Sequence, residues 1–458
     1  MSLSRRSFAA TLAAPLFGAQ PDAWQRMAEV LKRIRPPQFP ARDFPITRFG
    51  AVADGKADCT DAFQKTIAAC AAAGGGRVVV PEGIFLTGPI HLKSNVNLHL
   101  LKGSAVKFLQ DPSRYMPVVF TRWEGMECMN YSPFVYADRQ KNIAITGEGT
   151  LDGQSDASHW WPWKGRAEYG YAKGGPQQAK ARALLAEMVE RDVPVEQRVF
   201  GEGSYLRPQF IQPCRCENVL IEGVTIVNSP MWEIHPLLCR NVIVRNVKVN
   251  SHGPNNDGCD PESCADVLIE NCLFDTGDDC IAIKSGRNRD GRRVAMPSEN
   301  IIVRNCEMKD GHGGVTIGSE ISGGCRNVFI EDCRMDSPNL DRVLRLKTNS
   351  VRGGFIENVY LRNVTVGQVA DAAIHIDFLY EEGDSGKFPP AVSNIDITNL
   401  RCRKMKSVVY ARGYASAPIR EIRLKDCVFE SAAEADTLEH VEGLTMTNVM
   451  VNGKLAKH

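Results

Sequence analysis

The sequence has almost no excess of either charge. Its 458 residues include 55 Lys and Arg against 54 Asp and Glu, a formal net charge of +1. Proteins that bind nucleic acid or anionic membranes usually present a broad field of positive charge, so neither partner is expected here. An anionic ligand would have to be held by a local cluster of Lys and Arg. At 43% hydrophobic residues, the chain has enough apolar material for a large folded core.

Beyond its first residues the chain has no apolar run long enough to span a bilayer. The start contains Arg5 and Arg6, followed by an apolar run over 8–17, a pattern typical of a twin-arginine export signal. We predict that residues 1–20 are a signal, that 21–43 are a linker, and that the exported protein is periplasmic or extracellular and free of the membrane. An ordinary N-terminus is the alternative, because the small-residue cleavage site is imperfect.

The sequence also lacks a complete zinc motif, although it contains fifteen cysteines. Cys214 and Cys216 are not matched by a second His or Cys pair at zinc-ligand spacing. Because the count is odd, at least one thiol stays free or pairs between chains if the others form disulfides. We expect most of the cysteines to be small core residues, and the disulfide pairing and oligomeric state stay open.

A short pattern of Asn or Asp followed by three mostly apolar residues recurs along most of the chain. Many neighbouring copies are about 23 to 27 residues apart, and the wider gaps contain insertions with Gly or Pro, which indicates a repeat protein. The copies begin at Asn142, Asn218, Asn241, Asp266, Asn300, Asn327, Asn358 and Asn394.

Each repeat is predicted to form strand, turn and strand. In residues 267–274, a β-branched apolar run is followed by Asn271 at a bend and then by a second short apolar run. Units that cannot bury their own apolar faces must stack, which predicts an all-β parallel β-helix with coils about 4.8 Å apart. Inward columns are expected at matching positions of successive coils: Cys272, Cys306, Cys333 and Cys427, and Asn246, Asn271, Asn305 and Asn363.

Two segments interrupt or precede the repeats. A short amphipathic helix is predicted from Thr60, which would be its N-cap, and this helix would cover the open end of the solenoid. The segment of about 155–208 breaks the period and is predicted to be an insertion on the flank, with a helix near 177–191. The β-helix domain as a whole is assigned to residues 44–453.

Four fragments put acidic and basic side chains at the same phase of successive coils. They are Asn255-Asn256-Asp257-Gly258-Cys259-Asp260, Gly277-Asp278-Asp279-Cys280, Gly311-His312-Gly313 and Arg345-Leu346-Lys347. Alternate residues of a strand share a face, so Arg345 and Lys347 are expected to point together while Leu344 and Leu346 point inward. Counting along the coils places Asp257 beside Asp279, and Asp278 beside His312.

Three adjacent carboxylates cannot all ionise easily, so one is expected to keep a proton near neutral pH while another stays charged. Glycoside hydrolysis needs this division, because one acid protonates the leaving oxygen and a carboxylate activates water or attacks the sugar. The alternative for each Asp is a turn residue or a structural cation ligand. Arg345 and Lys347 suit a sugar carboxylate, and their alternative is a solvated salt-bridge ladder with the acids.

At these four fragments the sequence resembles the polygalacturonases of glycoside hydrolase family 28, and the resemblance runs from about Phe44 to the last coil. The family's Asn-Thr-Asp, Gly-Asp-Asp, Gly-His-Gly and Arg-Ile-Lys motifs stand here with Asn256 for Thr and Leu346 for Ile. The resemblance implies a single right-handed parallel β-helix, a pectin lyase-like solenoid, with an N-terminal capping helix and a flanking insertion.

The resemblance also implies the roles of the site residues in hydrolysis of α-1,4-galacturonosyl linkages with inversion. Asp278 would be the general acid, Asp257 and Asp279 would position the attacking water, and His312 would support the acid. Arg345 and Lys347 would hold galacturonate carboxylates. Further substrate-binding candidates in the same coils are Asn255, Asp260 and Lys284. No metal or cofactor is implied, and the partner would be a pectic polysaccharide or oligogalacturonide.

Several alternatives stay open at this stage. Rhamnogalacturonan hydrolases of the family are expected to lack the His of Gly-His-Gly, so His312 favours galacturonan. A polysaccharide lyase or epimerase that uses calcium is the rival from the same fold, and a non-catalytic solenoid that binds glycans is the rival from another class. The insertion carries an aromatic cluster and ends near Arg207. It would close one end of the groove for exo action, or its Trp residues would only pack the insertion onto the solenoid. The aromatic residues of this cluster are Trp160, Trp161, Trp163, Tyr169 and Tyr171.

Overall fold

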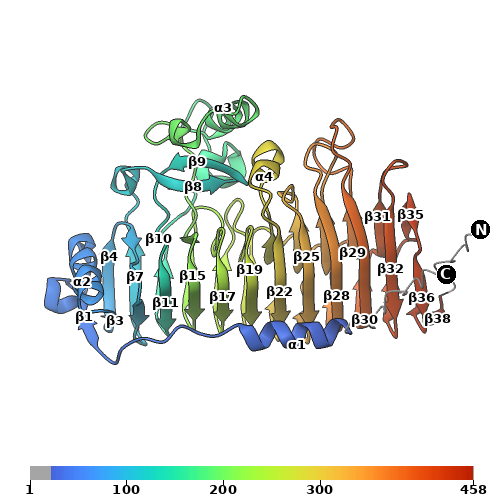
Figure 1. Ribbon diagram of the computed structural model, residues 1–458, viewed down its shortest axis with the longest axis horizontal. Helices are drawn as coiled ribbons and strands as arrows, with labels where there is room; N and C mark the ends of the chain where they lie inside the picture. The colour runs from blue at the N-terminus through green and yellow to red at the C-terminus, as the bar shows by residue number, and fades with distance from the viewer. Residues whose placement is uncertain (1–21, 457–458) are drawn as a thin grey trace, which may run out of the picture.

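The computed structural model describes residues 22–456, so the export signal predicted for residues 1–20 lies outside the described residues. Strands stack along one long axis, with helix α2 (Thr60–Ala72) at one end and helix α1 (Ala23–Arg33) along the lower edge (Figure 1). Helices α3 (Ala179–Glu190) and α4 (Asn288–Val294) lie on the upper side. Pairing between successive coils is parallel, so the predicted parallel β-helix is confirmed.

The coils contribute strands to three faces of the solenoid, and the strands within each face are parallel. The first face contains the repeated Asn-apolar motif. In stacking order this face contains β1 (Asp43–Pro45), β3 (Gly76–Val80), β6 (Val96–Leu100), β11 (Lys141–Gly147), β15 (Glu217–Glu222), β17 (Arg240–Arg245), β19 (Ala265–Glu270), β22 (Ser298–Arg304), β25 (Cys325–Glu331), β28 (Phe355–Gln368), β30 (Ala391–Met405), β32 (Ile419–Lys425) and β36 (Thr445–Thr447).

The second face follows the first after a bend in each coil. It contains β2 (Asp54–Asp58), β4 (Gly83–Thr87), β7 (Ser104–Phe108), β12 (Thr150–Asp152), β16 (Thr225–Val227), β18 (Lys248–Ser251), β20 (Leu273–Thr276), β23 (Glu307–Met308), β26 (Arg334–Met335), the later parts of β28 and β30, β33 (Val428–Ala432) and β37 (Met450–Val451).

The third face carries the residues with candidate chemistry. It contains β5 (Ile90–His91), β10 (Val135–Asp138), β14 (Ile211–Cys214), single bridges at Ile234 and Cys259, and then β21 (Ile281–Ile283), β24 (Val315–Gly318), β27 (Leu344–Lys347), β29 (Ala372–Asp377), β31 (Ser407–Arg412) and β34 (Thr437–Glu439).

The recurrent Asn forms the bend between coils. Asn218 and Asn241 adopt φ of 60° and 55°, a left-handed conformation that Asn tolerates better than most residues. Their side chains also stack, because the Asn241 amide donates to Asn218 Oδ1 at 2.7 Å and Asn218 donates to Asn142 Oδ1 at 2.9 Å. The Asn repeat is therefore a structural ladder that links coils.

The side chains of the three apolar residues after each Asn point in two directions. Val219 and Ile221 point into the core, whereas Leu220 between them points outward. The outward residues of successive coils form an apolar stripe, and Met27 and Val30 of α1 pack against it. The segment 21–43, predicted to be a linker, thus contains a helix that covers this stripe. The stripe residues are Ala144, Leu220, Ile243, Leu268, Ile302 and Phe329.

Helix α2 covers the open end of the solenoid as predicted, and its Phe63 and Ile67 are part of the core. The predicted cap is wrong by one position, since Thr60 is the first helical residue and Asp58 Oδ1 accepts from the Thr60 N–H at 2.9 Å. An Asp two residues earlier thus supplies the acceptor expected of Thr60.

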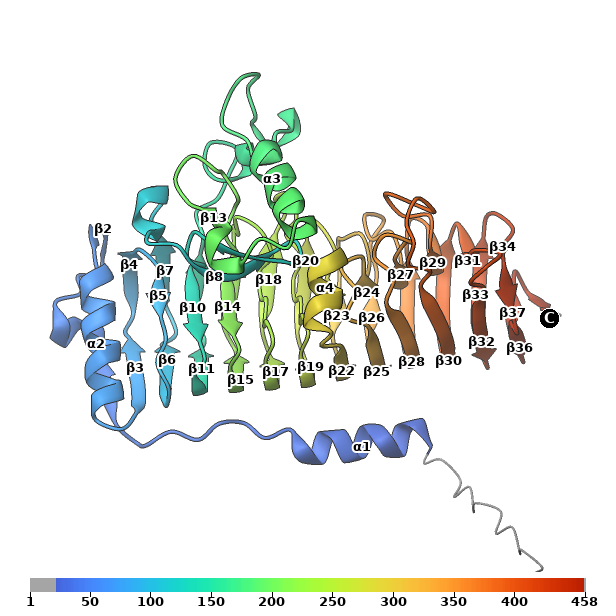
Figure 2. The same ribbon diagram turned by 45° about the horizontal axis from the view of Figure 1, so that its top comes forward.

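The insertion lies above the middle of the solenoid (Figure 2). It contains α3, which confirms the helix predicted near 177–191. Beside it, β8 (Val119–Trp123), β9 (Met126–Asn130) and β13 (Val199–Phe200) form a small sheet. Within residues 22–456, no helix has the length and apolar character needed to cross a membrane.

All fifteen cysteines are buried and unpaired, which confirms their assignment as core residues. Cys272, Cys306 and Cys333 occupy matching positions of three adjacent coils, because the strands that follow them pair Leu273 with Glu307 and Glu307 with Arg334. The predicted thiol column is therefore confirmed for these three coils, and Cys427 shares their phase but is separated from them by Val364 and Leu400. The predicted inward position of Asn246, Asn271, Asn305 and Asn363 is wrong, because all four are exposed and adopt positive φ.

Candidate active site

The candidate acids lie just before the strands of the third face, and the strand register brings them together. Ile281 pairs with Cys259 on one side and with Val315 on the other. This register places Asp257 beside Asp279 and Asp278 beside His312, as counting along the sequence predicted. One carboxylate oxygen from each of the three acids lies within 4.8 Å of the others.

Asp279 is fully buried and held by three donors. Lys347 Nζ lies 2.7 Å from Oδ2, whereas Arg345 Nη1 lies 3.3 Å and Thr316 Oγ1 lies 2.8 Å from Oδ1. Burial alone would raise the pKa of Asp279, but the charges of Lys347 and Arg345 outweigh it and hold the pKa far below its usual range. Asp279 is therefore ionised.

Asp278 forms a pair with His312 from the next coil. His312 Nδ1 lies 2.9 Å from Asp278 Oδ1, and the second oxygen, Oδ2, accepts from the Asn255 amide at 3.4 Å. Burial would raise the pKa of Asp278, but the hydrogen bond and charge of His312 outweigh it and lower the pKa. Asp278 in turn raises the pKa of His312 to about 9. Near neutral pH the pair therefore holds one proton.

Asp257 has the opposite environment. Burial, followed by the charge of Asp278, raises the pKa of Asp257 to about 8 even though Lys284 Nζ lies 3.5 Å from Oδ2. The protonation states of the acids therefore differ as expected, because Asp257 retains a proton near neutral pH while Asp279 stays charged. The protonated member of the substrate-free cluster is Asp257, however, and the member expected from the resemblance was Asp278.

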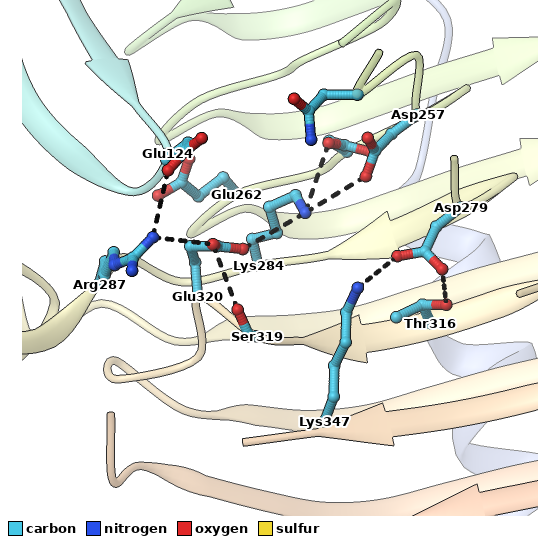
Figure 3. A network of polar contacts seen from close by, with 12 residues as sticks. Glu124, Asp257, Glu262, Asp279, Lys284, Arg287, Thr316, Ser319, Glu320 and Lys347 are labelled. Atoms are coloured by element: carbon cyan, nitrogen blue, oxygen red, sulfur yellow. Dashed lines mark hydrogen bonds and ion pairs between the residues drawn. The ribbon is translucent and has the colours of Figure 1, made fainter. Parts of the chain in front are cut away.

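Lys284 lies at the centre of a buried ionic network (Figure 3). Its Nζ is 3.6 Å from Asp260 Oδ2 and 3.4 Å from Glu320 Oε2, and it lies 4.4 Å from the centroid of the Trp232 ring. Asp260 is fully buried, and burial raises its pKa well above the usual value. This position does not fit the expected contact of Asp260 with substrate.

These residues surround a cavity of about 350 Å³, within the range of small-ligand sites. Seven of the nine predicted site residues line the cavity: Asn255, Asp257, Asp278, Lys284, His312, Arg345 and Lys347. Asp279 and Asp260 lie behind them. Lys347 is buried, the Arg345 side chain is only 12% exposed, and both contact fully buried Asp279, so their pairs with Asp279 are not a solvated salt-bridge ladder.

Apart from Tyr169, which belongs to the aromatic cluster named above, the rest of the cavity wall was not predicted from the sequence. Four lining residues come from the insertion, and others come from distant coils or from the β8–β9 turn. Their motifs do not recur with the coil period, so no spacing marks them. They include Lys164, Arg166, Tyr169, Arg182, Glu124, Arg287, Glu320, Tyr380 and Glu381.

Glu124 fastens the insertion to the coils at the edge of the cavity. Its Oε2 lies 2.6 Å from Arg182 Nε on α3 and 3.2 Å from Arg287 Nη1 near α4.

The aromatic residues of the insertion do not all lie in the same environment. Trp160 is buried against Tyr115 and Phe134, so the packing alternative describes it, whereas Tyr169 lines the cavity.

The three acids are close enough to share a cation, but most of their oxygens already face positive groups. Both oxygens of Asp279 accept from Lys347 or Arg345, and Asp278 Oδ1 faces His312. A metal ion there would compete with these three cations.

Comparison with known proteins shows similarity to one enzyme family. A family model described as glycosyl hydrolases family 28 matches residues 201–453. The chain is 48% identical to an exopolygalacturonase of Thermotoga maritima of known structure, with a TM-score of 0.92 over 94% of this chain and 96% of that one.

More distant relatives cover most of the chain. A probable polygalacturonase of Vitis vinifera is 27% identical over 88% of this chain and 78% of its own length. An exo-poly-alpha-D-galacturonosidase of Dickeya chrysanthemi is 28% identical over 74% of this chain and 57% of its own length. The right-handed form of the β-helix is supported by these matches.

Proposed function

Since the chain belongs to glycosyl hydrolase family 28 and is a glycoside hydrolase, we propose that it hydrolyses α-1,4-galacturonosyl linkages of polygalacturonan from a chain end, with inversion. One observation supports an acidic sugar as the substrate. Half-buried Arg345 and buried Lys347 are cations that line the same cavity as the acids Asp257 and Asp278. A neutral sugar would leave their remaining donors without an anionic partner, whereas a uronate carboxylate accepts from both.

In the proposed mechanism, Asp278 protonates the leaving glycosidic oxygen through Oδ2. The pair holds one proton, and in the reacting complex this proton lies on Asp278 Oδ2 while neutral His312 keeps its 2.9 Å contact to Oδ1. The proton passes to the leaving oxygen as the bond from the anomeric carbon to that oxygen breaks, which leaves Asp278 ionised beside neutral His312. The pair regains its proton from solvent after product release. The raised pKa of His312, about 9, keeps this proton available at neutral pH.

Asp257 and Asp279 would hold the attacking water. Asp257 lines the cavity and would contact the water, with ionised Asp279 behind it. The Asp257–Asp279 pair, which holds one proton, takes up the proton that the water loses as its oxygen bonds to the anomeric carbon. Two-carboxylate inverting enzymes usually separate these groups by about 6.5–9.5 Å. Here one oxygen from each of the three acids lies within 4.8 Å of the others, and the water would be held by Asp257 and Asp279 of this cluster.

Exo action is supported by the wall that the insertion builds. Lys164, Arg166 and Tyr169 line the cavity beside the acids, and Arg182 on α3 lines it as well. Such a wall would stop a polymer from passing through the groove, and it would admit a chain end. The names of the relatives from Thermotoga maritima and Dickeya chrysanthemi agree with this mode of action.

The proposal is tested by incubating the enzyme with galacturonan, rhamnogalacturonan and xylogalacturonan and following product size and anomer by NMR. We expect short products from the start of the reaction on galacturonan, first released as the β-anomer. Early mixed oligomers would refute exo action, and an initial α-anomer would refute inversion. An ultraviolet-absorbing unsaturated product that depends on calcium would favour a lyase.

Export through a twin-arginine signal is part of the proposal and rests on Arg5 and Arg6 before an apolar run. Replacing both arginines with Lys should retain the protein in the cytoplasm of a bacterial host. Unchanged export of this variant, measured by cell fractionation, would refute the assignment.

A further inference from the structure

Asn255 connects the insertion to the proposed general acid. Its Oδ1 accepts from Lys164 Nζ at 2.7 Å and from Arg207 Nη2 at 2.9 Å. Ammonium and guanidinium groups only donate hydrogen bonds, so the atom between them must be the amide oxygen. The amide nitrogen then occupies the other arm, where it lies 3.4 Å from Asp278 Oδ2.

This contact falls on the functional oxygen of Asp278. Oδ1 already accepts from His312 and from the backbone N–H of Asp279 at 3.0 Å. Oδ2 is therefore the oxygen left to face a leaving group, and the Asn255 amide is its hydrogen-bond donor among the described residues. The orientation of one amide thus decides whether Oδ2 meets an N–H or a carbonyl.

Both cations are held rigidly by the insertion and the solenoid. Arg207 is fully buried and donates to the carbonyls of Pro230 at 2.7 Å and Pro254 at 2.6 Å, the latter just before Asn255. Lys164 ends the short helix η3 (Trp161–Lys164), which is anchored by the Trp161 indole donating to the Ser229 carbonyl at 2.8 Å. Asn255 itself has a φ of 55°, so its backbone is confined to one turn conformation.

We propose that Lys164 and Arg207 are positioning residues, which lock the Asn255 amide so that its N–H donates to Oδ2 of Asp278. The insertion would then set the orientation and proton affinity of the general acid in addition to walling the cavity. This inference rests on the proposed function, because it takes Asp278 as the acid.

Removing the contacts that hold the Asn255 amide should raise the pKa of the Asp278–His312 pair. If the amide turns over, its carbonyl faces Oδ2, which disfavours the carboxylate and favours the protonated acid. Loss of the Lys164 charge acts in the same direction. The Asp278–His312 pair would hold its proton more tightly, so the basic limb of the pH profile would move to higher pH.

Other charged groups also face Asp278 and stay in place in the variants below. From adjacent coils these are His312, Asp279, Asp257, Asp260, Arg345 and Lys347. From the insertion they are Tyr169 and Arg207, in addition to Lys164 itself, which the test replaces.

The test compares Lys164→Met, Lys164→Arg and Asn255→Asp with the exposed control Lys173→Met. Asn255→Asp keeps an oxygen for both cations and replaces the donor that faces Asp278. For Lys164→Met and Asn255→Asp we expect kcat to fall about tenfold, KM to change less than about threefold and the basic limb to rise by about 0.5–1 pH unit. Lys164→Arg should restore most of kcat, and Lys173→Met should match wild type.

A second readout does not need turnover. The pKa of His312, followed by NMR and assigned with a His312→Asn variant, should rise in Lys164→Met and stay unchanged in Lys173→Met. If the wild type hydrolyses galacturonan but Lys164→Met and Asn255→Asp keep its kcat, basic limb and His312 pKa, the inference is overturned. A wild type inactive on galacturonan, with the His312 pKa still raised in Lys164→Met, would overturn the proposed function and leave the positioning of Asp278 supported.

Discussion

The contact between Lys347 and Asp279 should be among the strongest single interactions of the site. Their charged atoms are 2.7 Å apart, and the side chains are 8% and 0% exposed. At an effective dielectric constant of about 20, unit charges at this distance attract by roughly 6 kcal/mol, and desolvation of both groups removes part of this gain. Arg345 stays 3.3 Å from Asp279 when Lys347 is removed, which limits the loss. We expect Lys347→Met to lower the free energy of unfolding by about 3 kcal/mol at pH 7.

The effect should depend on pH with a definite sign. The folded-state pKa of Asp279 lies far below its usual value, so its contribution to stability is fully present above the unfolded pKa of about 3.9 and is lost as pH falls through the folded pKa. In Lys347→Met the folded pKa rises toward the usual range. The stability difference from wild type should therefore be full at pH 6–7 and should shrink as pH falls below about 4.

A double-mutant cycle measures the interaction itself. Unfolding in guanidinium chloride is followed for wild type, Lys347→Met, Asp279→Asn and the double variant, with Lys173→Met as an exposed-cation control. We expect a coupling free energy of about 2–3 kcal/mol at pH 7. A coupling below about 0.5 kcal/mol, or a stability difference that grows as pH falls, would refute the assignment of Asp279 as a buried carboxylate held by Lys347.

Three further predictions address other parts of the molecule. Asp278→Asn should reduce kcat on galacturonan by at least about a thousandfold while calorimetry shows substrate affinity within about threefold of wild type, and retained turnover would contradict the role of the acid. His312→Asn should move the basic limb of kcat to lower pH, because Asp278 alone holds the proton less tightly than the pair does, and an unmoved limb would contradict a shared proton. Val30→Asp should cost about 2–4 kcal/mol of stability, because it places a carboxylate against the apolar stripe under α1. The exposed Glu29→Gln should cost less than about 0.5 kcal/mol, and equal losses would contradict the role of α1 as a cover.

Local sequence patterns were sufficient for the architecture. A period near 25 residues with Asn at a fixed place predicts stacked coils, because each repeat must bury its apolar face against the next. The same period also predicted the neighbours Asp257 and Asp279, and Asp278 and His312, since parallel coils convert equal phase into contact. The buried cysteines followed from the same reasoning, because residues at one phase share one environment.

The sequence analysis did not predict features whose residues do not recur with the coil period. The outward position of Leu220 could have been inferred from three apolar residues in a row, since a strand with one buried face should alternate. That signal predicts a cover over the stripe, and α1 is the cover. The wall residues Lys164, Arg182 and Glu124 carry no comparable signal, because they reach the cavity from an insertion and a turn of unrelated sequence.

The sequence alone determined that this chain stacks coils and that acids, His312 and the pair Arg345 and Lys347 share one face, because strand periodicity and coil length are local properties. Only the tertiary structure decided which acid keeps a proton. That choice depends on burial and on the distances to Lys347, Lys284 and His312, which come from different coils. The link from the insertion through Asn255 to Asp278 was also decided there, because the contact distances within a fold are not contained in the order of residues along the chain.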